Sequence, residues 1–237
     1  MTRFHAASVV GKIVAERPDL ARVFEAHGVD YCCGGKRSVQ EACQARGLDL
    51  GQLLEALHVA AAEGGEPHPV DPATLSLSAL ADHIEQTHHR YLRREFPRLD
   101  TLTEKVARVH GEKEPRLREV RRVVLQLTEE LMSHMLKEER ILFPMIRALD
   151  TDGPRPEFHC GTIAHPILQM EVEHDDAGAS LAQLQTLTDN FTPPAWACTT
   201  YRLLVDALKT LQQDLHQHIH KENNILFPRA LQLEAAG

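Results

Sequence analysis

The sequence predicts an all-α protein in which a four-helix bundle follows a small helical domain. Three observations support this fold class. The phrase His-x-x-x-Glu-x-x-Ile-Leu-Phe-Pro occurs at residues 134–144 and again at 218–228. Four long stretches carry apolar residues at helical spacing, and no alternating strand pattern competes with them. The surroundings of the phrase also repeat, so we expect a bundle made of two similar halves.

Residues 1–64 are predicted to form the small domain. Its third helix opens with the capping box Ser38-x-x-Glu41 and ends near Gly47, a residue that commonly terminates helices. The helical patterns of this domain cover residues 8–16, 18–27, 38–47 and 49–62.

Residues 65–75 are predicted to be a linker, because the segment is rich in glycine and proline and lacks periodicity. The bundle is expected to occupy residues 76–237. Pro144 and Pro228 should kink or terminate its second and fourth helices, since proline cannot donate the backbone hydrogen bond. The four helical patterns cover approximately residues 76–109, 115–149, 165–190 and 194–232.

The composition excludes several classes of protein. The chain has 237 residues and a formal charge of −8, which argues against a general nucleic-acid binder. The arginines at 116, 118, 121 and 122 alternate with acids and are interpreted as a solvated helix face. No apolar run approaches the roughly 20 residues of a membrane span, and the amino terminus lacks a secretory signal. We therefore expect a soluble, cytoplasmic protein without a membrane partner.

The cysteines indicate reduced thiols and one reactive site. Five is an odd number, which disfavours a disulfide framework in a chain without a signal peptide. Cys32 and Cys33 lie in Asp30-Tyr-Cys-Cys-Gly-Gly-Lys36, which is expected to be an exposed, flexible turn where Lys36 and Arg37 favour thiolates. The alternative is an incidental loop. Cys43, Cys160 and Cys198 are expected to be buried in apolar packing.

The repeated phrase predicts half of a metal site in each copy. Residues four apart lie on one face of a helix, so His134 stands beside Glu138 and His218 beside Glu222. His89 and His174 lie in the helices that precede these phrases. Two metals with two terminal histidines each and two shared glutamates would use this set, whereas a single zinc needs fewer ligands. A bundle without metal would leave costly unpaired polar groups in its core.

Together with Glu173-His174-Asp-Asp-Ala-Gly178, these motifs make the chain resemble the repair-of-iron-centres (ScdA/YtfE) family over nearly its full length. The resemblance implies a hemerythrin-like bundle behind a cysteine-bearing domain, two carboxylate-bridged non-haem iron ions per chain, and a stress response that restores damaged iron–sulfur clusters. It also implies that Glu130 and Glu173 lie near the iron without binding it directly, where they support its ligands or line the iron exit. The iron ligands carried over by motif are His89, His134, Glu138, His174, His218 and Glu222.

Other histidines lie close to these positions in the sequence. His88 adjoins His89, and His216 and His220 flank His218, but the repeat register and the motif alignment both select His89 and His218. The segment 158–165 contains His159, Cys160 and His165. Whether these three residues bind anything is left open, and a plain loop is the favoured interpretation.

Three functions are compatible with the sequence. The leading hypothesis is supply of iron from a labile centre to clusters damaged by nitrosative or oxidative stress in other proteins, with Cys32 and Cys33 assisting by redox or metal-transfer chemistry. The alternative is a nitric oxide reductase or scavenger that uses the same site. A hemerythrin-type oxygen carrier or sensor is disfavoured, because hemerythrins use one more histidine. Whether the protein is an enzyme, and whether it forms a homodimer, is left open.

Overall fold

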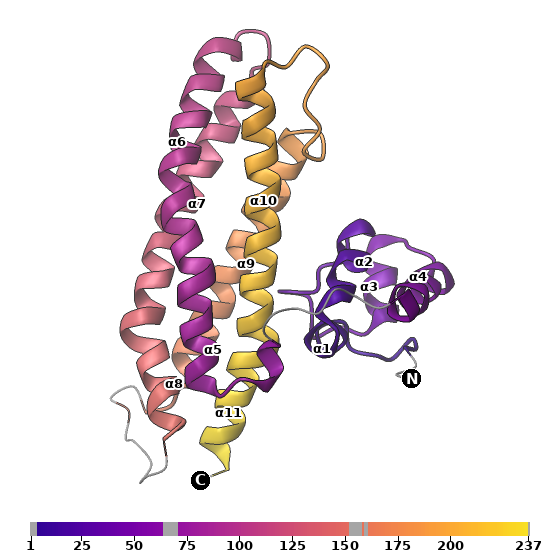
Figure 1. The fold of residues 1–237 in the computed structure, drawn as a ribbon, viewed down its shortest axis with the longest axis vertical. Coiled ribbons are helices and arrows are strands. Elements are labelled where there is room, and N and C mark those ends of the chain that lie inside the picture. The colour runs from indigo at the N-terminus through magenta and orange to yellow at the C-terminus, as the bar shows by residue number, and fades with distance from the viewer. Residues whose placement is uncertain (1–3, 64–70, 152–157, 159–160, 237) are drawn as a thin grey trace.

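The computed structural model describes residues 4–63, 71–151, 158 and 161–236. This part of the chain is helical, and its only β-type pairing is an isolated bridge between Val9 and Ser38. A small domain packs against the side of an elongated bundle (Figure 1). None of the described helices is both long enough and apolar enough to cross a membrane. The predicted all-α fold class is confirmed.

The small domain contains the helices predicted for it. The capping box is present: the backbone N–H of Glu41 donates to Ser38 Oγ at 3.2 Å, and the N–H of Ser38 donates to the Glu41 carboxylate at 2.8 Å. The second predicted helix is divided into a 3₁₀ turn and an α-helix. The elements are α1 (Val10–Glu16), η1 (Pro18–Leu20), α2 (Ala21–Ala26), α3 (Val39–Arg46) and α4 (Leu50–Glu63).

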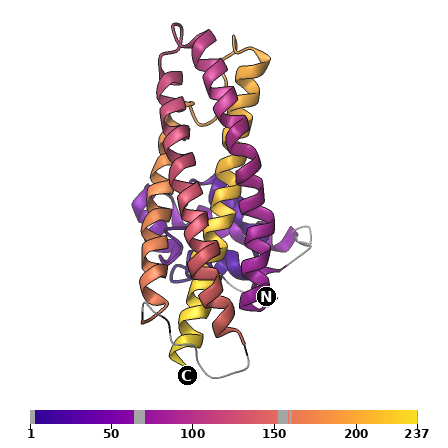
Figure 2. The same cartoon turned by 90° about the vertical axis from the view of Figure 1, so that its left-hand side faces the viewer.

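The bundle consists of four long rods that run side by side in both views (Figures 1 and 2). Three of the rods contain two α-helices joined by a π-helical turn. Most of the predicted linker lies outside the described residues, and the 3₁₀ turn η2 (Pro72–Thr74) leads into the first rod. The rods are α5 (Leu77–Ile84), η3 (Glu85–His89) and α6 (Arg90–His110); α7 (Arg116–Lys137), η4 (Glu138–Leu142) and α8 (Phe143–Leu149); α9 (Ala164–Leu187); and α10 (Thr199–Lys221), η5 (Glu222–Leu226) and α11 (Phe227–Ala235).

The helices do not terminate at the two prolines. Pro144 and Pro228 are the second residues of α8 and α11, and each of these helices directly follows a π turn. In a regular α-helix the proline ring would clash with the carbonyl four residues earlier, and the wider turn relieves this contact. The helices therefore continue past both prolines, and Glu138 and Glu222 open the turns.

The bundle core is divided into two apolar clusters. One includes Leu92, Leu131 and Leu215, and the other, toward α8 and α11, includes Phe143 and Phe227. Each rod passes from one cluster to the other through a short polar segment. This arrangement predisposes the middle of the bundle to hold a buried polar centre.

Candidate metal centre

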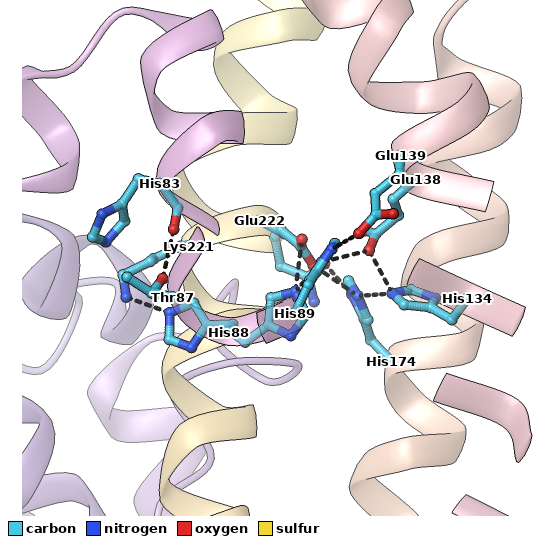
Figure 3. A network of polar contacts seen from close by, with 12 residues as sticks. His83, Thr87, His88, His89, His134, Glu138, Glu139, His174, Lys221 and Glu222 are labelled. Carbon is cyan, nitrogen blue, oxygen red and sulfur yellow. Dashed lines mark hydrogen bonds and ion pairs between the residues drawn. The ribbon is translucent and has the colours of Figure 1, made fainter. Parts of the chain in front are cut away.

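The four histidines and two glutamates predicted from the repeat meet in this polar layer. Figure 3 labels all of them except His218. His89 is the last residue of η3, His174 lies in α9, and the other four residues lie where α7 and α10 pass into their π turns. Each of the six is at most 1% exposed. In each His-x-x-x-Glu phrase the histidine lies in the last turn of the long helix and the glutamate is the first residue of the π turn.

The six residues form two groups that share both carboxylates. His89 and His218 make one group with Glu138 and Glu222, and His134 and His174 make the other with the same glutamates. The ligand atoms in each group lie within 4.8 Å of one another. The two imidazole Nε2 atoms are 3.2 Å apart in the first group and 3.1 Å apart in the second. Two cations with bridging carboxylates would suit this donor set.

Three of the four imidazoles are oriented by a hydrogen bond at the opposite ring nitrogen. His89 Nδ1 lies 2.7 Å from Glu139, and His134 Nδ1 lies 2.9 Å from Glu173. His174 Nδ1 lies 2.8 Å from Asn223 Oδ1. All three partners are acceptors, so we assign the proton to Nδ1, which leaves the Nε2 lone pair directed into the centre.

The centre therefore requires positive charge. The Nε2 atoms of His134 and His174, which both carry a lone pair in this assignment, are 3.1 Å apart, and neither carboxylate oxygen of Glu138 has a hydrogen-bond partner in the described structure. Buried polar atoms arranged in this way are costly unless a cation or a proton lies between them. The residues present thus fit a metal.

The ionisation of the centre supports the same conclusion. Burial and the neighbouring Glu222 oppose ionisation of Glu138, but His134 and His89 lower its pKa below the usual value. Burial lowers the pKa of His134, whereas Glu138 and Glu173 raise it, to about 10. In the absence of metal, a proton on His134 would supply the charge that the carboxylates require.

Sequence comparison agrees with this geometry. The profile described as the hemerythrin HHE cation binding domain matches residues 80–230, and an ScdA amino-terminal profile, described as a domain of unknown function, matches residues 6–61. Relatives named iron–sulfur cluster repair protein YtfE are 40% identical in Enterobacter over 94% of this chain and 96% of the relative. The relative in Musicola paradisiaca is 40% identical over 95% of this chain and 97% of its own length. The relative in Escherichia coli is 38% identical over 94% of this chain and 96% of its own length. The chain belongs to the YtfE family of iron–sulfur cluster repair proteins.

Two residues that orient the histidines of this YtfE-family protein were not predicted from the sequence. Glu139 and Asn223 directly follow Glu138 and Glu222, so they occupy equivalent places in the two copies of the repeated phrase. Glu139 accepts a hydrogen bond from His89, and Asn223 accepts one from His174. In each half, this is the histidine that lies outside the repeated phrase. The repeat contains this signal, but the two residues differ in type, and only the structure connects them to His89 and His174.

Of the two acids expected beside the site, only Glu173 touches a histidine of the centre. Its carboxylate accepts from His134 and is also contacted by Lys137. Glu130 is exposed and accepts a hydrogen bond from Gln126 at 2.9 Å. Both acids line a cleft of about 540 Å³ between α7 and α9 that reaches His134. Glu130 therefore belongs to the approach to the centre rather than to its inner support.

The neighbouring histidines lie outside both groups. His88 Nδ1 is 2.9 Å from Asp214, its Nε2 is 2.6 Å from Lys221 Nζ, and its ring stacks parallel to His218. His216 and His220 pack edge-on against the ring of Tyr31 in the small domain. Their neighbour His218 alone points into the centre, as the repeat register indicates.

The cysteine pair does not form the exposed turn that the sequence suggested. Cys32 is 4% exposed and packs with the bundle core, while Cys33 is half-buried. Lys36 pairs with Glu171 of α9 at 2.7 Å instead of facing the thiols. The adjacent Cys33, burial and Asp30 hold the pKa of Cys32 well above its usual value. The expected thiolate is therefore wrong for Cys32, because docking removes it from water and from the basic side chains.

The other cysteines differ in their surroundings. Cys43 is buried as predicted. Cys198 is exposed at the start of α10, with its sulfur 3.2 Å from His110 Nε2, so the prediction of a buried side chain is wrong there. His159 and Cys160 lie outside the described residues. His165 lies in the first turn of α9, away from both groups.

Proposed function

We propose that this protein repairs iron–sulfur clusters damaged by nitrosative or oxidative stress, and that it does so by supplying iron from the buried centre. The observation that carries the proposal is the pair of four-residue groups with shared carboxylates, in a chain related to iron–sulfur cluster repair proteins. The clients would be proteins with damaged clusters. The proposed iron ligands are His89, His134, Glu138, His174, His218 and Glu222.

The proposed load is two iron ions per chain. Each group offers two imidazoles, and Glu138 and Glu222 would bridge the two ions. Bound ferrous ions would supply an exchangeable iron pool and, in a redox reaction, electrons. Glu139, Glu173 and Asn223 hold the Nδ1 protons of three ligands, so that the Nε2 lone pairs remain available for the metal.

Release is proposed to occur on the side of His134. The cleft between α7 and α9 reaches this histidine and is lined by Glu129, Glu130, Glu173 and Asp176. Carboxylates at this position would attract and hand over a divalent cation. In the proposed division of the chain, residues 76–237 store the iron and residues 1–64 carry the thiols, joined by the linker at 65–75.

Nitric oxide reduction or scavenging is the second candidate function. One contact favours it: Cys33 Sγ lies 3.5 Å from the backbone carbonyl of His174, so one thiol touches the backbone of a proposed ligand and could deliver electrons through it. No contact in the described structure speaks for an oxygen carrier, which has no evident use for thiols.

The test compares metal content with two activities. Protein purified without oxygen should contain two irons per chain, transfer iron to an apo cluster protein and lose both properties in His134→Ala. His110→Ala, which changes a histidine at the far tip of the bundle, is the matched control and should keep them. A reproducible single metal, or zinc as the native metal, would falsify the proposal. Nitric oxide consumption without iron transfer would favour the second candidate.

A further inference from the structure

A third cluster of metal-ligating side chains lies in the small domain, between α2 and α3. The ligand atoms of Asp30, Cys32 and Cys33 all lie within 4.8 Å of one another. Cys32 Sγ is 3.2 Å from Asp30 Oδ1 and 3.8 Å from Cys33 Sγ. These residues belong to neither group of the bundle centre.

The bundle contributes a fourth donor to this cluster. Cys33 Sγ lies 3.5 Å from the backbone carbonyl oxygen of His174. That carbonyl is part of α9, but a carbonyl oxygen has two lone pairs and accepts a second partner readily. Position 178 leaves room for the sulfur, since even a Cβ there would lie 3.6 Å from Cys33 Sγ. The donors are therefore two sulfurs and two oxygens.

The distances fit tetrahedral coordination. Metal–sulfur bonds of about 2.3 Å and metal–oxygen bonds of about 2.0 Å at tetrahedral angles separate two sulfurs by about 3.8 Å, and a sulfur from an oxygen by about 3.5 Å. The observed separations are 3.8 Å between the sulfurs, and 3.2 Å and 3.5 Å from a sulfur to an oxygen. Of these three edges of the tetrahedron, the one between Cys32 and Asp30 has to lengthen slightly.

The turn is held in place before any cation arrives. The backbone N–H groups of Cys32 and Cys33 each donate to Asp30 Oδ1 at 3.0 Å, and that of Gly34 donates to Oδ2 at 2.9 Å. Asn224 Nδ2, from the bundle, donates to the carbonyl of Cys32 at 3.0 Å. A cation would therefore not have to order the loop, which lowers the cost of binding.

We propose that Asp30, Cys32, Cys33 and the carbonyl of His174 form a third cation site, for a thiophilic divalent ion of the Fe²⁺ and Zn²⁺ class. Binding breaks two S–H bonds, forms two metal–sulfur bonds and releases two protons to solvent, without any change of oxidation state. Sulfur ligands select these ions over Mg²⁺ and Ca²⁺.

Cobalt titration of the metal-free, full-length protein tests the site. Co²⁺ should bind in three equivalents per chain, and one of them should produce thiolate-to-cobalt charge-transfer absorption, which histidine and carboxylate ligands do not give. Cys32→Ser and Cys33→Ser should each abolish this absorption and retain two equivalents. Cys198→Ser, which removes an exposed cysteine outside the turn, is the matched control and should keep it.

A measurement on the unaltered chain covers the case in which the turn variants fold poorly. Co²⁺ should protect the half-buried Cys33, but not the exposed Cys198, from alkylation located by mass spectrometry. Two equivalents without thiolate absorption or protection would overturn the third site and leave the bundle centre intact. Failure to bind any cobalt in the bundle would instead count against the proposed function. Thiolate absorption that survives in both turn variants would also overturn the site.

Discussion

The contact between Gly11 and Asn224 gives the most direct test of how the small domain docks on the bundle. A Cβ at position 11 would lie 2.2 Å from Asn224 Oδ1 and 3.0 Å from the carbonyl oxygen of Gly35. The Asn224 side chain has little freedom to move away, because its Nδ2 donates to the carbonyls of Tyr31 and Cys32. We expect Gly11→Ala to weaken docking.

The magnitude follows from the overlap. An extra methyl group in a packed contact costs about 1–3 kcal/mol. Since each 1.4 kcal/mol is a factor of ten, the undocked population should rise roughly 5- to 150-fold. Alanine also favours the helix α1 by up to about 1 kcal/mol, so global unfolding would partly conceal the effect. The assay must therefore report docking itself.

Alkylation of Cys32 is such an assay. This thiol is 4% exposed and packs within the bundle core, so it becomes reactive only when the domains separate. Its labelling rate, followed by mass spectrometry, should rise by the factor given above in Gly11→Ala. Gly51→Ala is the matched control, because among the described residues a Cβ there would meet Asp49 Oδ1, at 3.2 Å, and no atom of the bundle.

A double substitution makes the test decisive. Asn224→Ala alone should also expose Cys32, because two hydrogen bonds are lost. In the Asn224→Ala background, however, Gly11→Ala should add little, because the overlapping oxygen is gone. The expected coupling is about 1–3 kcal/mol between the two positions. Strictly additive effects, or an unchanged labelling rate in Gly11→Ala, would refute this docking geometry.

Three further predictions concern the centre and the thiols. His134→Ala should lower the iron content of the protein. Because metal binding contributes about 3–4 kcal/mol at saturating metal, the substitution should also lower the melting temperature by about 6–16 °C. Full iron content by metal analysis together with an unchanged melting temperature by calorimetry would show that His134 is not a ligand. Replacing Cys32 and Cys33 together with serine should leave the bundle iron in place and reduce repair activity, and a loss of iron would instead indicate a structural role. Metal affinity should also depend on pH, because a proton on His134 competes with the metal. Burial lowers the pKa of metal-free His134, but Glu138 and Glu173 raise it to about 10, so this proton must leave before the metal binds. Each pH unit below that value should weaken binding by about tenfold, and competition titrations that give equal affinities at pH 7 and pH 8 would contradict the assignment.

The fold and the six central residues could be predicted because their signals are local. Helical periodicity defines each rod, and a spacing of four residues places His134 beside Glu138 without reference to the rest of the chain. The repeat added that His218 and Glu222 do the same in the second half. It also distinguished His89 from His88, whose ring the structure places against Asp214 and Lys221.

Other features depend on contacts between elements that are distant in sequence. The π turns before Pro144 and Pro228 leave no periodic signature in the sequence, although Glu138 and Glu222 are their first residues. The support of His134 by Glu173 joins α7 to α9, and a one-dimensional pattern does not contain that contact.

The cysteine pair shows the division most clearly. The glycines and the neighbouring basic residues by themselves indicated an exposed, reactive turn, because the sequence does not show that another domain covers it. The tertiary structure decided otherwise: Asn224 and the α9 backbone hold Cys32 and Cys33 against the bundle, and Lys36 is directed to Glu171. The sequence alone thus determined which donor atoms the chain carries and how they are spaced along each helix, because helix geometry is local. Only packing between the two domains decided the environment of the thiols, because desolvation and charge depend on whatever surface lies opposite.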